Sequence, residues 1–245
     1  MAKKKVRHTA ESFEVLSDSS SFVYSEGMKA LRTNIEFVAA TDACKVIMIT
    51  SAVSGEGKTS MSINLAVALA QNGKRVLVVD CDLRRPKIQR YLRIKTAQDC
   101  GTSTVLNGTA DLDSAIGYVE ELGIYVMLSG TVPPNPSELL ASNNAAKMFE
   151  RIRDRFEYII LDTPPVTVVS DAAVMSKYID GAVMIVRQNY ASRNQLIDAV
   201  ERLRTVDTKL LGAVFNHYNS KLDHEYGYGY TDTYYSGYYY AKSKK

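Results

Sequence analysis

A glycine-rich loop that ends in a lysine and a threonine is the stretch whose residue types and spacing most clearly imply chemistry. Residues 51–60 read SAVSGEGKTS. Gly55 and Gly57 can adopt positive φ angles and let backbone N–H groups close around a phosphate. Lys58 can neutralise the β- and γ-phosphates of a nucleotide, and the Thr59 hydroxyl can bind Mg²⁺. The loop therefore predicts ATP and Mg²⁺ as ligands. Seven residues are assigned to the nucleotide: Ser54, Gly55, Glu56, Gly57, Lys58, Thr59 and Ser60.

The elements around this loop support the assignment. The apolar run at 46–50 predicts a buried strand, and residues 61–71 predict a helix. A strand, a glycine loop and a helix in this order form a P-loop, because the helix adds its unpaired N-terminal N–H groups and the positive end of its dipole. Ala52 replaces the first glycine of the Walker A pattern, so it must adopt a conformation that a Cβ tolerates. The alternative is a serine-rich turn that contains Gly-Lys-Thr by chance.

Three aspartates stand at the ends of two further predicted strands. Asp80 and Asp82 come at the end of the run at 75–80, and Asp162 follows the run at 156–161 in the form of a Walker B motif. The carboxyl ends of parallel strands meet at the edge where α/β proteins bind ligands, so we expect these carboxylates at the active site. Helix capping is the structural alternative for a single aspartate. A dinucleotide-binding fold is disfavoured, because the loop lacks G-x-G-x-x-G.

The remaining elements must hold these groups together. Further strands are predicted at 124–128, 181–187 and 210–215. Further helices are predicted from near Ser137 to 156, from the cap Asp171 to Tyr178, and over 192–205. Residues 87–122 are predicted to form short helices and loops. Alternating strands and helices imply right-handed crossovers between parallel strands. We therefore predict an α/β P-loop NTPase fold, with a mostly parallel sheet covered by helices on both faces.

An early helix is predicted from Glu26 to about Ala40, with Ser25 as its N-cap. Met28, Leu31, Ile35 and Val38 recur at helical spacing and form its apolar face. Charged residues recur every third position on another face: Glu26, Lys29 and Arg32. From spacing alone, this row is either a solvated stripe or an oligomer contact.

Composition limits the classes of function. The net charge of +3 in 245 residues does not call for nucleic acid as a partner. Three cysteines without C-x-x-C spacing predict a reduced cytosolic protein without structural zinc. The N-terminus lacks the apolar core of a signal peptide, and no stretch approaches the roughly 20 apolar residues that cross a bilayer. We therefore expect a cytoplasmic protein that reaches a membrane only through a partner.

The C-terminal segment from 226 to 240 holds eight of the 16 tyrosines, interleaved with glycine, serine and threonine. It lacks aliphatic residues, so a disordered segment is predicted. A self-associating segment and a stacking platform for single-stranded nucleic acid are two interpretations, but the second needs arginines, which the segment lacks. The third is that the tyrosines accept phosphate: Tyr226, Tyr228, Tyr230, Tyr234, Tyr235, Tyr238, Tyr239 and Tyr240.

Taken together, these motifs resemble the bacterial tyrosine kinases of capsule and exopolysaccharide synthesis. The resemblance rests on the Walker A loop, on VLVVDCDLR and IILDTPP, on the charged early helix and on the tyrosine cluster. This family is similar in fold to the cell-division and plasmid-partition ATPases, MinD and ParA. Those ATPases usually carry an extra lysine where Val53 stands here, which favours the kinase. The resemblance extends from about Glu26 to the C-terminus. The polar, serine-rich composition of residues 1–20 predicts a flexible arm, which leaves a P-loop kinase domain at 21–222 and a disordered, tyrosine-rich acceptor tail at 223–245.

The resemblance also implies roles for individual residues. Lys58 would neutralise phosphate charge, and Asp80 would orient the tyrosine hydroxyl and accept its proton. Three residues would hold Mg²⁺ directly or through water: Thr59, Asp82 and Asp162. Asn216 would contact adenine. The catalytic set is accordingly Lys58, Asp80, Asp82 and Asp162.

Partners follow from the same resemblance. The family implies a homo-oligomeric ring through Glu26, Lys29 and Arg32, with Lys29 in place of the usual arginine. It implies phosphorylation in trans of the neighbour's tail, a membrane adaptor that recruits and activates the kinase at the inner face of the membrane, a cognate phosphotyrosine phosphatase, and control of polysaccharide polymerisation and export. The alternative function is a MinD- or ParA-like positioning ATPase without kinase activity.

Overall fold

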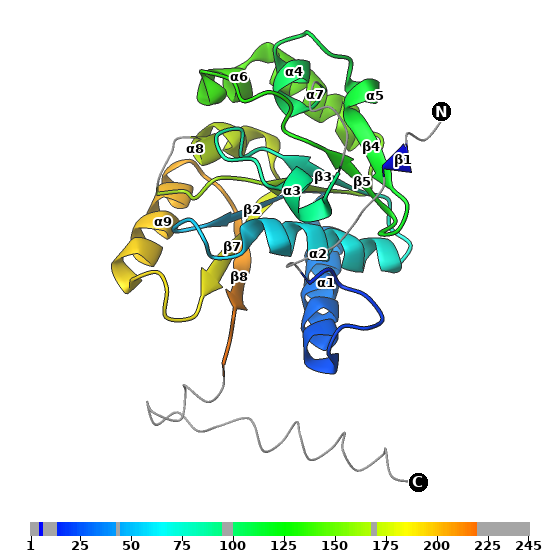
Figure 1. Cartoon of the computed structure of the whole chain (residues 1–245). Coiled ribbons are helices and arrows are strands. Elements are labelled where there is room, and N and C mark those ends of the chain that lie inside the picture. The colour runs from blue at the N-terminus through cyan, green and yellow to red at the C-terminus, as the bar shows by residue number, and fades with distance from the viewer. Residues whose placement is uncertain (1–4, 7–13, 43–44, 95–99, 168–170, 220–245) are drawn as a thin grey trace.

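An eight-stranded sheet runs through the centre of the protein, as the computed structural model shows in Figure 1. The structure describes residues 5–6, 14–42, 45–94, 100–167 and 171–219. The strand order is β1-β4-β5-β3-β6-β2-β7-β8. Their bounds are β1 Lys5–Val6, β2 Val46–Ser51, β3 Val76–Asp80, β4 Ile116–Val119, β5 Ile124–Met127, β6 Tyr158–Asp162, β7 Gly181–Arg187 and β8 Leu210–Asn216.

The sheet is parallel except where β4 pairs with β5 in antiparallel orientation. Its central strands β2, β3 and β6 are buried along their whole length, as expected for β-branched and aliphatic runs covered on both faces. The prediction of a mostly parallel sheet in a P-loop fold is thereby confirmed. The strand β4 was not predicted, because a four-residue strand with a central glycine gives little sequence signal.

Helices cover the two faces of the sheet unequally. Their bounds are α1 Phe22–Asp42, α2 Lys58–Gln71, α3 Ile88–Leu92, α4 Thr102–Leu106, α5 Leu112–Ala115, α6 Pro136–Ala141, α7 Asn143–Arg153, α8 Asp171–Met175 with a 3₁₀ turn at Ser176–Tyr178, and α9 Arg193–Thr205. One face packs against α1, α2 and α3, and the other against α4 to α9. Alternate residues of one strand enter the two cores, as with Val78 and Leu77 of β3.

Two predicted helix boundaries are wrong. The first helix begins at Phe22, so Ser25 lies inside its first turn, and the Ser21 hydroxyl accepts the Tyr24 N–H at 3.3 Å instead. The helix predicted to start near Ser137 is two helices, because Ser142 ends α6 and its hydroxyl caps α7 by accepting the Ala145 N–H at 3.2 Å. The predicted apolar face of α1 is confirmed, since Met28 and Ile35 are both buried.

Both ends of the chain extend beyond the described residues. In the predicted arm, Leu16 is buried at 5% exposure and its N–H donates to Asn64 Oδ1 of α2 at 2.7 Å. All eight predicted acceptor tyrosines lie outside the described residues. Within the described part of the chain, no helix combines the length and apolar character needed to cross a membrane.

Candidate active site

The strand order explains how residues that are distant in sequence meet. The neighbouring strands β3, β6, β2, β7 and β8 all run in the same direction, so their carboxyl ends share one edge. This edge carries Asp80 at the end of β3, Asp162 at the end of β6 and the glycine loop after β2. Arg187 and Asn216 end the last two strands. The residues predicted at the strand ends therefore lie along one edge of the sheet.

The loop between β2 and α2 has the predicted backbone conformation. Gly55 and Gly57 have φ angles of 90° and 97°, values that side chains disfavour. Ala52 is fully buried and does not have a positive φ, so its Cβ is tolerated as expected. A Cβ on Gly57 would also collide with the Asn216 amide nitrogen. The loop therefore needs glycine at 57 both for its conformation and for space.

The loop leads directly into Lys58 and Thr59, the first residues of α2. Both side chains are buried at 8% exposure. The Thr59 hydroxyl donates to Asp162 Oδ2 at 2.6 Å, which joins the Walker A and Walker B segments. Burial lowers the pKa of Lys58, although Asp162 and Asp82 oppose this effect. The ammonium thus faces carboxylates in a site that is poor in water.

Asp80 and Asp162 are paired residues on adjacent strands, and both are 1% exposed. Burial raises the pKa of Asp162 to about 6, although the hydrogen bond from Thr59 lowers it in part. Burial and the charge of Asp162 raise the pKa of Asp80 well above its usual range, against N–H groups of Ile88 and Lys87. Two buried carboxylates side by side therefore lack sufficient positive charge, which favours binding of a cation.

Asp82 follows Asp80 in a turn stabilised by backbone groups. Its N–H donates to Asp80 Oδ1 at 3.2 Å, and its Oδ1 accepts the Arg85 N–H at 3.0 Å. Burial raises the pKa of Asp82, while the Arg85 N–H and the Lys58 ammonium lower it. Main-chain N–H groups thus orient the carboxylates of both Asp80 and Asp82.

The residues predicted to bind Mg²⁺ fit this ion in chemistry and number. Thr59, Asp82 and Asp162 offer hydroxyl and carboxylate oxygens, the ligands that Mg²⁺ prefers. Among the described residues, no three histidine, cysteine or acidic side chains are close enough to enclose a metal. A Mg²⁺ site with few protein ligands is the usual arrangement when phosphates and water complete the coordination.

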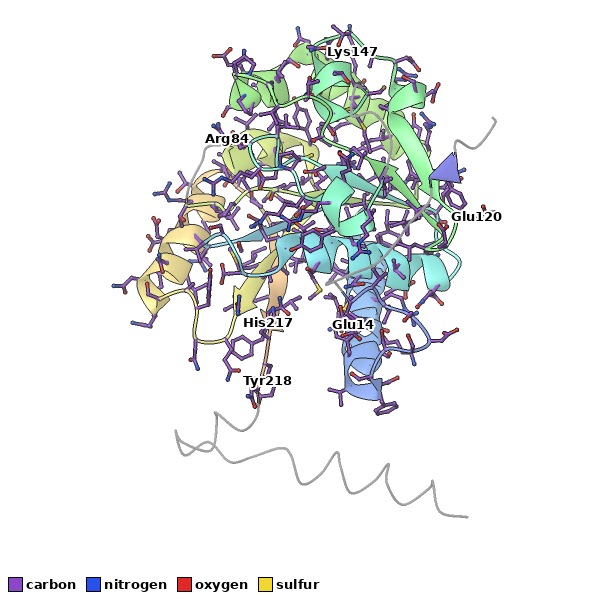
Figure 2. The ribbon with its side chains drawn as sticks, in the orientation of Figure 1. Glu14, Arg84, Glu120, Lys147, His217 and Tyr218 are labelled. Carbon is purple, nitrogen blue, oxygen red and sulfur yellow. The ribbon has the colours of Figure 1, made fainter. Side chains whose placement is uncertain are left out.

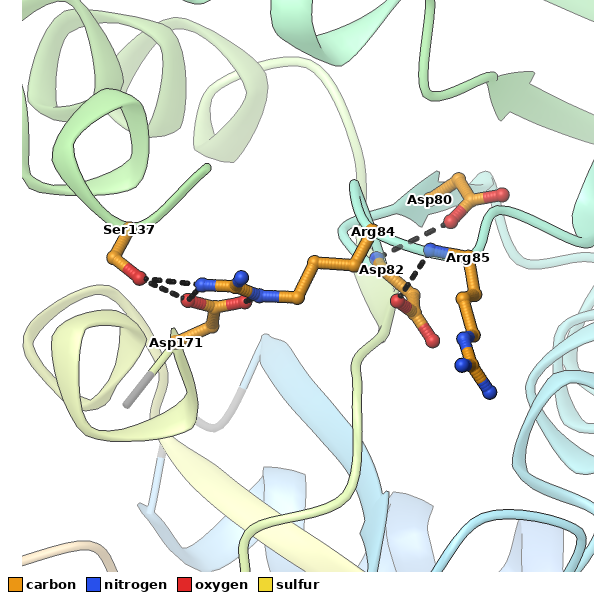
Figure 3. Close-up of polar contacts among 6 residues, drawn as sticks. All are labelled: Asp80, Asp82, Arg84, Arg85, Ser137 and Asp171. Atoms are coloured by element: carbon orange, nitrogen blue, oxygen red, sulfur yellow. Dashed lines mark hydrogen bonds and ion pairs between the residues drawn. The ribbon is translucent and has the colours of Figure 1, made fainter. Parts of the chain in front are cut away.

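An arginine that the sequence analysis did not single out links the Asp80–Asp82 turn to the start of α8 (Figure 3). Arg84 donates to both oxygens of Asp171, from Nε at 2.9 Å and from Nη2 at 3.1 Å. Asp171 is fully buried and also accepts from the Ser137 hydroxyl. The side chain of Asp171, which was predicted only as a helix cap, thus binds a guanidinium and a hydroxyl. Ser137 and Arg84 contact each other at 2.9 Å.

The opposite side of the site holds the P-loop through strands β7 and β8. Glu56 is fully buried, and its two oxygens accept the N–H groups of Val53 at 2.9 Å and Arg187 at 3.2 Å. The Arg187 guanidinium donates to the Gly55 carbonyl at 3.2 Å and lies over the Tyr190 ring. Neither Arg187 nor Tyr190 was predicted, because no motif marks them.

Asn216 supports the P-loop from the same side as Glu56 and Arg187, and these three residues together form the brace of the loop. Its amide nitrogen donates to the Glu56 carbonyl at 2.8 Å, and its oxygen accepts the His217 N–H at 2.9 Å. The predicted adenine contact of Asn216 stays a prediction. Its position at the end of β8, against the P-loop, is what the structure adds.

The three residues predicted as an oligomer interface have partners within the chain. Lys29 pairs with Glu26 at 2.8 Å on the exposed side of α1. Arg32 is half-buried, pairs with Glu36 at 3.8 Å and donates to the Ala68 carbonyl at 3.4 Å. The pair of Lys29 and Glu26 is solvated, so exchange for a partner's charges would cost little. The interface itself stays a prediction.

The fold and site together define a P-loop nucleoside triphosphatase. A family model described as an AAA domain matches residues 44–211. The MinD protein of Pyrococcus horikoshii OT3, solved with Mg-ADP, superposes with a TM-score of 0.61 at 23% identity over 72% of this chain and 71% of that chain, which establishes likeness of fold alone.

Closer relatives are more specific. The tyrosine-protein kinase YwqD of Bacillus subtilis (strain 168) is 37% identical over 204 residues, which are 83% of this chain and 85% of YwqD. The chimerical protein CapA2B2 has a TM-score of 0.77 at 33% identity over 82% of this chain and 88% of that chain. The kinase domain of Escherichia coli tyrosine kinase ETK has a TM-score of 0.74 at 31% identity, covering 79% and 77%. The chain therefore belongs to the bacterial tyrosine kinase family.

Proposed function

We propose that this protein is an ATP-dependent protein-tyrosine kinase that phosphorylates the tyrosine tail of a second copy. The observation that carries the proposal is the meeting of Lys58, Thr59 and Asp162 beside a buried Asp80 at one sheet edge. This edge has a phosphate cradle, donors for Mg²⁺ and a carboxylate for the incoming hydroxyl. The family membership of the chain and its tail of eight tyrosines support the same conclusion.

In the proposed reaction the phenolic oxygen of tyrosine forms a bond to the γ-phosphorus, the bond from this phosphorus to the β–γ bridging oxygen breaks, and ADP leaves. Lys58 and the loop N–H groups stabilise charge on the phosphates. Mg²⁺, held by Thr59, Asp82 and Asp162, would neutralise charge that develops on the β- and γ-oxygens. The brace of Glu56, Arg187 and Asn216 keeps the cradle in shape before the nucleotide arrives.

Asp80 is the proposed acceptor of the phenolic proton. An ordinary aspartate with a pKa of about 4 is a weak base for a phenol with a pKa near 10. Because phosphoryl transfer has a loose transition state, Asp80 need only orient the hydroxyl early and take the proton late.

The partners and the place of action are part of the proposal. Glu26, Lys29 and Arg32 would contact the next subunit of a ring, which brings one subunit's tail to its neighbour's site. A membrane adaptor with a cytosolic segment would recruit the kinase to the inner face of the membrane and activate it, and a phosphatase would reverse the modification. Tail phosphorylation, which adds about −1.5 to −2 charges per residue, would then regulate capsular or exopolysaccharide polymerisation and export.

A positioning ATPase is the second candidate, because MinD has the same fold. It would bind ATP to dimerise on a surface, and its tail would be a self-associating segment. Val53 in place of the extra lysine of those ATPases argues against this candidate, as does the tyrosine cluster.

Intact mass after incubation with Mg-ATP tests the proposal, with and without residues 226–245 and with the adaptor's cytosolic segment present. A ladder of phosphate additions that disappears on truncation is expected. ATP hydrolysis without any mass change would overturn the kinase and favour the positioning ATPase.

A further inference from the structure

A groove of about 1250 Å³ opens beside the nucleotide loop. Its lining includes Ser60 and Met61 at the start of α2 and Asn216 at the end of β8, so it adjoins the site described above. Helices α1 and α3 supply further parts of the lining. Small-molecule pockets measure roughly 300–1000 Å³. The groove therefore has room for a second ligand besides a nucleotide.

One side of the groove is basic. Lys87, Arg90 and Arg93 recur every third residue along α3 and its two flanking positions, and all three line the groove. Ile88 and Leu92, on the other side of this helix, are fully buried. Lys87 and Arg90 are exposed, and within the described residues no carboxylate forms an ion pair with either. Among the described lining residues, Glu14 is the single acid.

Four tyrosine and phenylalanine rings also line the groove. They are Tyr24, Tyr91, Phe215 and Tyr218. Phe215 lies near the end of β8 and Tyr218 two residues beyond that strand, and their ring centroids are 5.7 Å apart. Phe215 and Tyr218 are 54% and 53% exposed, so about half of each side chain is open to a ligand. Figure 2 shows Glu14, His217 and Tyr218 on the side of the molecule opposite Lys147. Cations and open aromatic faces together suit a peptide that carries both acids and aromatic rings.

The basic row begins at the proposed catalytic carboxylate. The Lys87 N–H donates to Asp80 Oδ2 at 3.2 Å. Because a helix rises 1.5 Å per residue, the row extends about 9 Å from Lys87 to Arg93. An extended peptide spans that distance in about three residues. A tyrosine at Asp80 would thus place residues up to three positions away against these cations.

We propose that this groove binds the acceptor segment of a second copy and selects tyrosines that have a carboxylate within three residues. The inference rests on the proposed kinase function and adds the specificity of its protein substrate. Between residues 223 and 240 the tail has three acids and no lysine or arginine, so its charge is opposite to that of the groove. The acids are Asp223, Glu225 and Asp232.

The proposed requirement for a carboxylate within three residues divides the eight tail tyrosines into two groups. Five lie within three residues of an acid: Tyr226, Tyr228, Tyr230, Tyr234 and Tyr235. Three are at least six residues from Asp232, the nearest acid: Tyr238, Tyr239 and Tyr240. The first group is modified first. Each new phosphotyrosine then supplies an anion for its neighbours, so the second group follows later.

Peptide binding tests the groove. The probes are a labelled peptide of residues 223–240 and the same peptide with Asp223→Asn, Glu225→Gln and Asp232→Asn. The protein is the full chain with its eight tail tyrosines changed to phenylalanine, loaded with Mg²⁺ and a non-hydrolysable ATP analogue. The expected result, from anisotropy at low salt, is about tenfold weaker binding of the neutral peptide, a preference that falls as salt is added.

Two variants connect the preference to α3. Arg90→Gln should remove most of the preference at unchanged affinity for the nucleotide analogue, and Lys87→Gln with Arg90→Gln should remove all of it. Lys147→Gln, an exposed cation on α7, is the matched control and should keep the preference. Equal binding of both peptides by the parent chain, or an unchanged preference in the double variant, would overturn the proposal.

Phosphate transfer to the same two peptides, measured with Mg-ATP in place of the analogue, separates the proposed peptide preference from the proposed kinase function. Equal phosphate transfer to both peptides would contradict the groove's proposed preference for acidic segments but would agree with the proposed kinase activity. A binding preference without transfer to any tyrosine would contradict the kinase and leave an acidic-peptide site. Mapping of early modifications in the wild-type chain should place them at residues 226–235, and early modification at Tyr238, Tyr239 or Tyr240 would contradict the proposed requirement.

Discussion

The two halves of the nucleotide site are built differently. On the P-loop side, the side chains of Glu56 and Asn216 form hydrogen bonds with backbone groups of the loop, of β7 and of the residue that follows β8. On the acidic side, Asp80 and Asp162 are as deeply buried as Glu56, but their pKa values are raised because their hydrogen-bond partners do not offset burial. The phosphate cradle is therefore complete before the ligand binds, whereas the acidic side needs a cation to complete it.

This contrast connects stability with catalysis. Buried groups that are fully hydrogen-bonded stabilise a fold, and buried charges without compensation destabilise it. Substitution of an acid by its amide should therefore have opposite effects on stability in the two halves.

Lys58→Met should reduce tyrosine phosphorylation at least about a thousandfold, because the substitution removes the cation that neutralises the phosphates in a buried site. The measurement is the rate of phosphate incorporation by intact mass. Lys147→Met, on the exposed side of α7, serves as the control and should retain activity. Residual phosphorylation at a comparable rate in purified Lys58→Met would remove the basis for assigning the site.

Asp80→Asn should lower the rate of transfer about a hundredfold or more, because an amide cannot accept the phenolic proton. The amide oxygen can still accept the N–H groups of Lys87 and Ile88, so the fold is retained, although the hydrogen bond from the Asp82 N–H to Oδ1 is lost. Removal of one of two adjacent buried charges should leave the melting temperature unchanged or raise it. A lower melting temperature would show that the two carboxylates do not repel each other.

Arg84→Ala should lower kcat about tenfold with little change in KM for ATP, because Arg84 acts by holding the turn that carries Asp82. Arg84 contacts no residue assigned to the nucleotide, and its partners are Asp171 and Ser137. Arg84→Lys should restore part of kcat, since lysine keeps the charge without the fork of donors. Equal loss of kcat in both variants, or a change in KM alone, would contradict a positioning role.

Glu56→Gln should destabilise the protein by about 1–3 kcal/mol, because the amide group would face the N–H of Val53 or Arg187 without an acceptor. The measurement is urea unfolding, which gives the free energy of unfolding directly. Glu150→Gln, an exposed position on α7, is the matched control. Equal stability of Glu56→Gln and wild type would mean that the loop is not braced.

Asp180 provides a pH test far from the nucleotide. Burial tends to raise its pKa, but the Arg153 guanidinium and the N–H groups of Val46 and Lys45 outweigh burial and lower it. The stabilisation is therefore present above the unfolded pKa of about 3.9 and is lost as the pH falls through the lower folded value. Asp180→Asn should cost about 1–2 kcal/mol at pH 7. That cost should shrink below about pH 4; a constant cost would contradict the ion pair.

Sequence reasoning found the parts of the site that local motifs mark. The glycine loop, Asp80 and Asp162 were predictable because a P-loop has fixed spacing and because apolar strands end at the ligand-binding edge. The alternation of strands and helices also predicted the sheet. Its order, which places β6 between β2 and β3, became visible only in the fold.

The contacts that stabilise the site were not predictable in this way. Arg84 and Asp171 are 87 residues apart, and Asn216 is 160 residues from Glu56, so no local pattern pairs them. The same holds for Arg187, whose contact with Gly55 depends on the adjacency of β7 and β2. Helix boundaries near serines were wrong for a different reason. Ser21 and Ser25 are equally good caps by residue type, and residue type alone did not mark Ser142 as the cap that divides the helix predicted from near Ser137.

Mixing of two variant chains tests directly whether one copy phosphorylates the tail of another. One chain carries Lys58→Met with its tail intact, and the other keeps Lys58 but has its eight tail tyrosines changed to phenylalanine. Neither chain alone should gain phosphate on Mg-ATP, whereas in the mixture the mass of the Lys58→Met chain should rise in steps of one phosphate. Phosphate on the Lys58→Met chain without its partner, or none in the active mixture, would contradict the account.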